Sequence, residues 1–166
     1  LLAASADRVT PSCIHFGQGR CWSCHWQHIN YETQLLLKQD VLADQLSRLG
    51  KIPDSVLESA MRPVAPAQDE WDYNFRMTLT RSKDDEWGYL RQNGWAVEPL
   101  QECHIVHPEL LALYEELDLD YERAKRMTLQ RGTDGQMMVI FEITEEEEPE
   151  LTTDLALSVN LILPDN

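Results

Sequence analysis

The chain has 166 residues, and its 43% hydrophobic and 26% charged residues are ordinary for a globular protein with a real core. Its formal net charge is −15, from 14 basic and 29 acidic residues, so a surface that binds nucleic acid throughout is excluded. No apolar run approaches the roughly 20 residues of a membrane helix, and we expect no membrane partner. The acidic residues concentrate at 115–122 and 145–150, two runs that we expect to be solvated.

The first distinctive segment, residues 11–30, mixes cysteine, histidine, glycine and aromatic residues without periodicity. Such a loop, rich in potential ligands and poor in aliphatic residues, usually needs a bound ion or cluster to order it. The chain opens on LLAASAD without an initiator methionine, and we read it as part of a longer chain. No targeting segment is recognisable, so we expect the cytoplasm, where disulfides are rare.

An amphipathic helix is predicted next, over residues 31–50. Leucines recur there at helical spacing, Asn30 can cap the N-terminus, and Gly50 ends the run. Prolines at 53, 63 and 66 then predict an extended connection.

From about residue 73 the apolar period changes to two, which predicts strands. Phe75, Met77 and Leu79 are expected to face the core, and a second helix is predicted at 108–118. The sequence GTDG predicts a hairpin turn. The predicted fold is α+β: an antiparallel sheet of about five or six strands, with two helices and an N-terminal cysteine-rich loop. The expected strands are 75–81, 87–90, 95–100, 126–131, 136–143 and 155–163.

The cysteine pattern allows three kinds of metal chemistry. C-x-x-C-H at Cys21–His25 is the attachment motif of c-type haem, which leaves Cys13 and Cys103 without a role. Zinc is compatible with the same cysteines and with the nearby histidines. An iron–sulfur cluster prefers thiolates and often takes its fourth ligand from far along the chain, so it alone uses every cysteine: Cys13, Cys21, Cys24 and Cys103.

Two stretches also resemble a known family. Cys13 and the stretch CWSCHWQHINYETQLLLKQDVLADQL, which begins at Cys21, resemble the cluster-binding segment of the RNA uracil-C5 methyltransferases. That family methylates uridines in ribosomal and transfer RNA. The stretch WGYLRQNGWAVEPLQECHIVHPELLALYEEL resembles that family's glycine-aromatic hairpin, which ends at a fourth cluster cysteine and leads into a helix. The matching positions are Gln27, His28, Tyr31, Gln34, Leu35, Lys38, Gly88, Arg91, Cys103 and Pro108.

The chain also departs from the family pattern in two places. The spacing between Cys13 and Cys21 is longer than is usual there. In place of a Tyr-Arg-Asn string it has Tyr-Asn-Phe-Arg at 73–76, so an expected RNA-facing arginine is missing or displaced.

The resemblance implies a [4Fe–4S] cluster on Cys13, Cys21, Cys24 and Cys103, in a part of the enzyme that presents RNA to a catalytic domain. It implies a cluster-binding loop and helix at 1–50 and a central sheet domain at 51–166. RNA would meet a local basic patch, whose expected residues are Arg20, Lys38, Arg76, Arg81 and Arg91.

No catalytic residue is predicted in this chain. Uracil methylation needs a cysteine nucleophile and a Gly-rich loop for S-adenosylmethionine, and neither is recognisable here once the four cysteines are assigned to the cluster. We therefore expect S-adenosylmethionine only in a catalytic domain absent from this chain, with that domain as a partner. The alternative is a non-enzymatic module that binds zinc or a cluster and recruits a basic protein.

Overall fold

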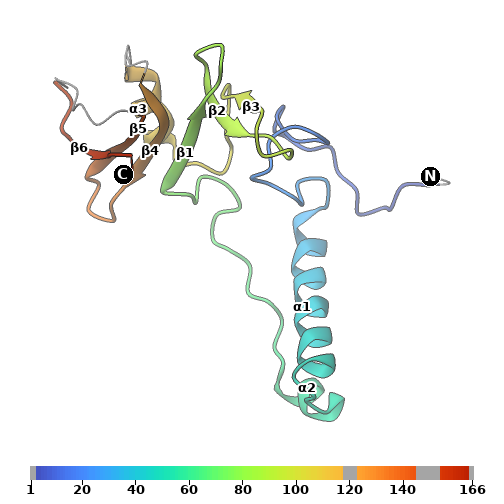
Figure 1. The fold of residues 1–166 in the computed structure, drawn as a ribbon. Helices are drawn as coiled ribbons and strands as arrows, with labels where there is room; N and C mark the ends of the chain where they lie inside the picture. Colours follow the sequence, from blue (N-terminus) through green and yellow to red (C-terminus); the bar gives the residue numbers. More distant parts are fainter. Residues whose placement is uncertain (1–2, 118–122, 145–153, 165–166) are drawn as a thin grey trace. The chain divides into compact units, whose positions relative to one another are not determined.

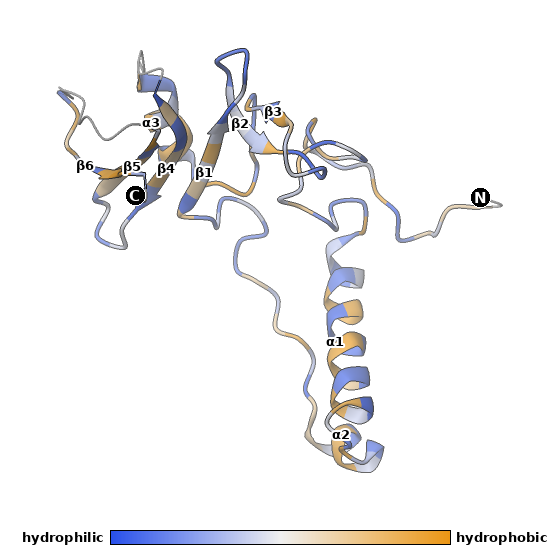
Figure 2. Ribbon diagram, viewed as in Figure 1, coloured by the Kyte–Doolittle hydropathy of each residue, from blue (hydrophilic) through white to orange (hydrophobic). Residues whose placement is uncertain are grey.

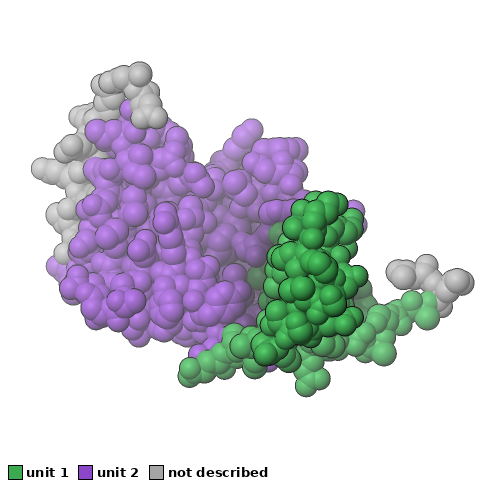
Figure 3. All heavy atoms as spheres, turned by 90° about the horizontal axis from the view of Figure 1, so that it is seen from below, with its two compact units in different colours: residues 1–12, 24–68 green, residues 13–23, 69–166 purple. Residues whose placement is uncertain are grey.

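A computed structural model describes residues 3–117, 123–144 and 154–164. The chain divides into two compact units (Figure 3): unit 1 comprises residues 1–12 and 24–68, and unit 2 comprises residues 13–23 and 69–166. These units are defined by contacts within the folded chain and not by independent folding. The predicted domain boundary at residue 50 is therefore untested and stays a prediction. The acidic run 145–150 and residues 118–122 of the other run lie outside the described residues.

Unit 1 is built on helix α1 (Tyr31–Arg48), which forms where it was predicted. The Asn30 side chain caps it by accepting the Thr33 backbone N–H at 2.9 Å. None of the eighteen residues of α1 is buried. Figure 2 shows apolar and polar residues alternating along the helix, and its exposed apolar residues are Leu36, Leu37, Val41 and Leu42.

A second helix in unit 1, α2 (Asp54–Ala60), lies where an extended connection was predicted. Pro53 stands at its N-cap, where the missing N–H costs nothing, because the first N–H groups of a helix have no acceptor within the helix. Leu57 of α2 is the one buried side chain among the described residues of unit 1.

Unit 2 is a six-stranded sheet with the order β3-β2-β1-β4-β5-β6 (Figure 1). The strands are β1 (Arg76–Arg81), β2 (Trp87–Leu90), β3 (Val97–Pro99), β4 (Ala124–Arg131), β5 (Met137–Ile143) and β6 (Leu157–Ile162). Neighbouring strands pair antiparallel except β5 and β6, which are parallel. The α+β prediction is confirmed, with a mixed sheet and a third helix as the differences.

The core of unit 2 lies between the sheet and helix α3 (Pro108–Glu116). On β1 the alternation places Met77 and Leu79 in this core, at 2% and 0% exposure. The prediction for Phe75 was wrong: its side chain is 46% exposed, and its ring stacks on His107 with centroids 5.1 Å apart. The sheet, the segment before α3 and α3 itself supply the other large buried side chains: Met127, Leu129, Val139, Ile143, Val106 and Leu110.

The parallel placement of β6 follows from its connection. A two-residue hairpin can join only antiparallel strands, whereas residues 144–156 are long enough for the crossover that a parallel pair requires. No helix in the described part of the chain is long and apolar enough to cross a membrane.

Candidate metal centre

Three of the four predicted ligands belong to unit 2. Cys13 and Cys21 lie in the loop of residues 13–23, which we call the ligand loop, and both are half-buried. Cys103 follows β3 and is buried. Cys24 is half-buried and belongs to unit 1. None of the four forms a disulfide, so each could ligate a metal as a thiolate.

The surroundings of Cys13 raise the pKa of its thiol. Burial is the largest cause that raises this pKa, and a hydrogen bond with the His15 backbone opposes it. The charge of Glu102 raises it further, as do Cys103 and Cys21 in their thiolate forms. Three thiols within electrostatic range disfavour one another's thiolates, and a bound cation would reverse that effect.

The four cysteines fit an iron–sulfur cluster in ligand type. However, the described residues contain no group of three or more His, Cys, Asp or Glu side chains already arranged to hold one metal ion. The shared four-cysteine site therefore remains a prediction.

Cys103 has a hydrogen-bond donor beside it. The Tyr89 O–H donates to the Cys103 Sγ at 3.7 Å, from β2 of the same sheet. A donor to a ligand sulfur stabilises its negative charge, and such bonds tune clusters. Sequence reasoning did not identify Tyr89, whose only signal was its position in the predicted strand 87–90.

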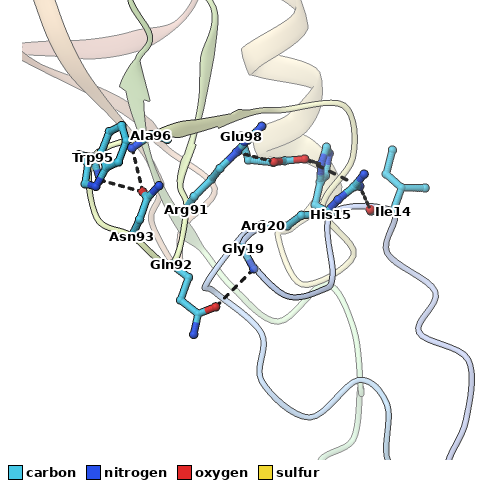
Figure 4. Close-up of polar contacts among 10 residues, drawn as sticks. All are labelled: Ile14, His15, Gly19, Arg20, Arg91, Gln92, Asn93, Trp95, Ala96 and Glu98. Atoms are coloured by element: carbon cyan, nitrogen blue, oxygen red, sulfur yellow. Dashed lines mark hydrogen bonds and ion pairs between the residues drawn. The ribbon is translucent and has the colours of Figure 1, made fainter.

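Next to the ligand loop lies a buried carboxylate, Glu98 of β3, whose side chain is 10% exposed (Figure 4). Its Oε1 accepts from His15 Nδ1 at 3.3 Å, and its Oε2 lies 2.9 Å from Arg91 Nε. Arg20 Nη1 lies 3.9 Å from Oε1. A buried carboxylate needs this kind of compensation, because an isolated charge is strongly disfavoured in a protein interior.

The hydrogen bonds of His15 define its tautomer. Its Nε2 accepts the backbone N–H of Gln101 at 3.1 Å, so the neutral ring carries its proton on Nδ1 and donates it to Glu98. His15 is 4% exposed. The sequence prediction considered His15 only as a histidine that could replace a cysteine at a zinc site, and it did not include Glu98, because nothing in the sequence shows that these distant residues meet.

The predicted RNA-contacting residues are dispersed. Arg20 and Arg91 share Glu98, and Arg81 pairs with Asp85 at 3.2 Å with its own side chain only 12% exposed. Arg76 is exposed at the start of β1, so about 17 Å of strand separates it from Arg81. Lys38 is exposed on α1 in unit 1. RNA contact by these residues remains a prediction.

Comparison with known proteins identifies the relatives. A Streptomyces avermitilis protein described as an uncharacterized RNA methyltransferase is 31% identical over 147 residues, which cover 84% of this chain and 34% of that protein. The 23S rRNA (uracil(1939)-C(5))-methyltransferase RlmD of Polaromonas naphthalenivorans is 36% identical over 110 residues, which cover 61% of this chain and 21% of that enzyme. No protein-family model matches the chain.

A solved structure supports the fold. The tRNA (uracil-54, C5)-methyltransferase of Pyrococcus abyssi, in complex with S-adenosyl-L-homocysteine, superposes with a TM-score of 0.55 at 18% identity. The superposition covers 95% of this chain and 42% of that one. The homologues of this chain are thus RNA methyltransferases, and those with a named target are RNA uracil-C5 methyltransferases, as the resemblance indicated. The chain spans about a third or less of the curated relatives' length.

Proposed function

We propose that this chain is the cluster-binding and RNA-presenting portion of an S-adenosylmethionine-dependent RNA uracil-C5 methyltransferase of the cytoplasm. The observation that carries the proposal is the sequence similarity to RNA methyltransferases over 84% of the chain. Four cysteines without a disulfide, three of them in unit 2, support the metal-binding part of it.

In this proposal Cys13, Cys21, Cys24 and Cys103 hold a [4Fe–4S] cluster. The case for Cys24 rests on the chain itself, since only two residues separate it from Cys21. When bound, the cluster joins distant segments through iron–thiolate bonds. The protein's own contribution is to bury Cys103, to donate the Tyr89 hydrogen bond and to anchor the ligand loop.

The test of the cluster is anaerobic preparation, with iron and sulfide measured per chain. We expect about four iron atoms and a broad visible band that dithionite bleaches. Each of the four single Cys→Ser variants should lose most of this iron. A colourless protein that contains zinc would favour the alternative metal-binding interaction module, and a sharp Soret band would favour haem.

Methyl transfer is assigned to a catalytic domain outside this chain. The isolated chain should therefore show no methyltransferase activity, and calorimetric titration with S-adenosylmethionine should give no heat of binding. Micromolar binding of that cofactor would contradict the assignment.

RNA contact should be local, weak and salt-dependent, because few basic groups act against a net charge of −15. Among the candidates, Arg76 offers the clearest test because its side chain is exposed. Arg76→Ala should weaken binding of a uridine-bearing stem-loop, whereas Arg48→Ala, which removes a cation paired with Asp44 on α1, should leave it unchanged. Equal losses, or tight binding that ignores salt, would count against a local patch.

A further inference from the structure

We propose that Glu98 and its partners His15, Arg20 and Arg91 form a clamp that fixes the ligand loop, so that Cys13 and Cys21 are positioned before any cluster binds. The ligand-positioning part rests on the proposed cluster site, whereas the effect on loop order does not. This proposal replaces the sequence-based expectation that a bound cluster orders the loop.

The clamp begins near the first cysteine of the loop. Both ring nitrogens of His15 are bonded. Nδ1 donates to the Glu98 carboxylate (Figure 4), and Nε2 accepts from the Gln101 backbone N–H. Next to it, the Ile14 N–H donates to Glu102 Oε1 at 2.7 Å. These bonds attach residues 14 and 15 to the segment that leads from β3 to Cys103.

The other end of the ligand loop is attached to the turn between β2 and β3. The Gln92 N–H donates to the Arg20 carbonyl at 3.1 Å, and Cys21 forms an antiparallel β-bridge with Arg91. The Arg20 guanidinium donates to the Ile14 carbonyl and so closes the loop on itself. Both cysteines of the loop thus lie next to fixed backbone.

Polar bonds rather than apolar packing hold this loop. His15 is the one buried side chain of residues 13–23, all of which the structure describes. Gly19 adopts φ +75°, a left-handed conformation that suits glycine, and its N–H faces Gln92 Oε1 at 3.4 Å. Because Glu98 joins the loop to β3 and Arg91, it is the group whose loss should release the loop.

The first test uses the chelator-treated protein without any metal, under anaerobic conditions. Amide hydrogen exchange of residues 13–23 and alkylation rates of Cys13 and Cys21 are measured for the native chain and for Glu98→Gln, which keeps the shape and removes the charge. We expect protection of at least tenfold over an unstructured peptide in the native chain and its loss in Glu98→Gln. The matched control is Glu109→Gln, which breaks the Arg131–Glu109 ion pair elsewhere in unit 2 and should leave the loop protected.

Circular dichroism checks that each variant folds. If Glu98→Gln does not fold, Arg20→Gln serves instead, since Arg20 is 53% exposed and belongs to the loop; about threefold faster alkylation is expected. The proposal is overturned if the native loop exchanges like an unstructured peptide, or if a folded Glu98 or Arg20 variant behaves like the native chain.

A second readout is the rate of cluster formation when iron and sulfide are added to the metal-free protein. The Glu98→Gln variant should load several times more slowly than the native chain while reaching the same final iron content. Equal loading rates overturn the positioning role. A protected native loop that takes up no iron at all supports the clamp as an anchor of the loop but overturns the proposed cluster function.

Discussion

The two units use their apolar residues in opposite ways. Unit 2 buries the inward face of its sheet against α3, and Leu79, Leu110 and Met127 each have 0% exposure. In unit 1 the amphipathic α1 buries no residue, and Leu36 is 63% exposed. An apolar helical face is therefore no proof of burial, and the stability of this chain should depend mainly on unit 2.

The largest expected effect compares one leucine from each unit. Leu79→Ala removes a fully buried side chain and should lower the free energy of unfolding by about 2–5 kcal/mol. Leu36→Ala should change it by less than about 0.5 kcal/mol, because its side chain is exposed. Urea denaturation followed by circular dichroism measures both, and equal losses would contradict the comparison.

A glycine of the sheet should be the next most sensitive position. A Cβ at Gly88 would meet the Glu98 carbonyl and the Pro99 backbone, which belong to the adjacent strand and cannot yield as a side chain does. Gly88→Ala should destabilise unit 2 by about 1–3 kcal/mol and separate β2 from β3. Increased amide exchange of residues 97–99 is the measurement, and unchanged exchange would refute the expected clash.

Cys103 is buried and Cys24 is half-buried, so we expect their substitution to affect stability differently. In the metal-free protein, Cys103→Ser should cost about 1 kcal/mol, because it buries a hydroxyl for which the nearby Tyr89 O–H is a partner. Cys24→Ser, at a half-buried site in unit 1, should cost less than about 0.5 kcal/mol. Thermal unfolding under chelation checks the difference, and a larger loss from Cys24→Ser would reverse the interpretation.

The smallest effect concerns Asp7 in unit 1. The Thr33 hydroxyl, which donates to its carboxylate at 2.9 Å, is the largest cause that lowers its pKa below the ordinary 3.8. Since the native pKa lies below the unfolded value, this group stabilises unit 1 at neutral pH, and the contribution is lost as the pH falls through the native pKa. Asp7→Asn should therefore lower helix stability more at pH near 7 than at pH near 3, measured by circular dichroism. An equal difference at both values would exclude the carboxylate as the cause.

Local pattern predicted most of the fold. The alternation around Met77 and Leu79, the Asn30 cap and the turn before Met137 involve only neighbours in sequence, and each forms as expected. The rest depends on distant partners. Phe75 continues the apolar alternation, yet it ends beside His107 and under the Arg131 guanidinium, 5.6 Å from its ring centre.

For the candidate site, sequence spacing identified the cysteines but not what holds them. His15 and Glu98 are 83 positions apart, and their contact exists only after β3 has paired with β2. In the sequence Tyr89 is likewise recognisable only as a strand residue, because its hydrogen bond to Cys103 depends on the folded structure. Pairing of remote segments cannot be derived from a local period, so these anchoring residues could not have been predicted.

The parallel position of β6 has a consequence for the order of folding. The hairpins β1–β2 and β4–β5 close through short turns, so their contacts cost little chain entropy to form. Strand β6 cannot pair with β5 by extending a hairpin from a short turn. A parallel pair requires the chain to return first to the other end of β5. We therefore expect β6 to dock late, leaving the outer edge of β5 transiently open to pairing with other chains during synthesis.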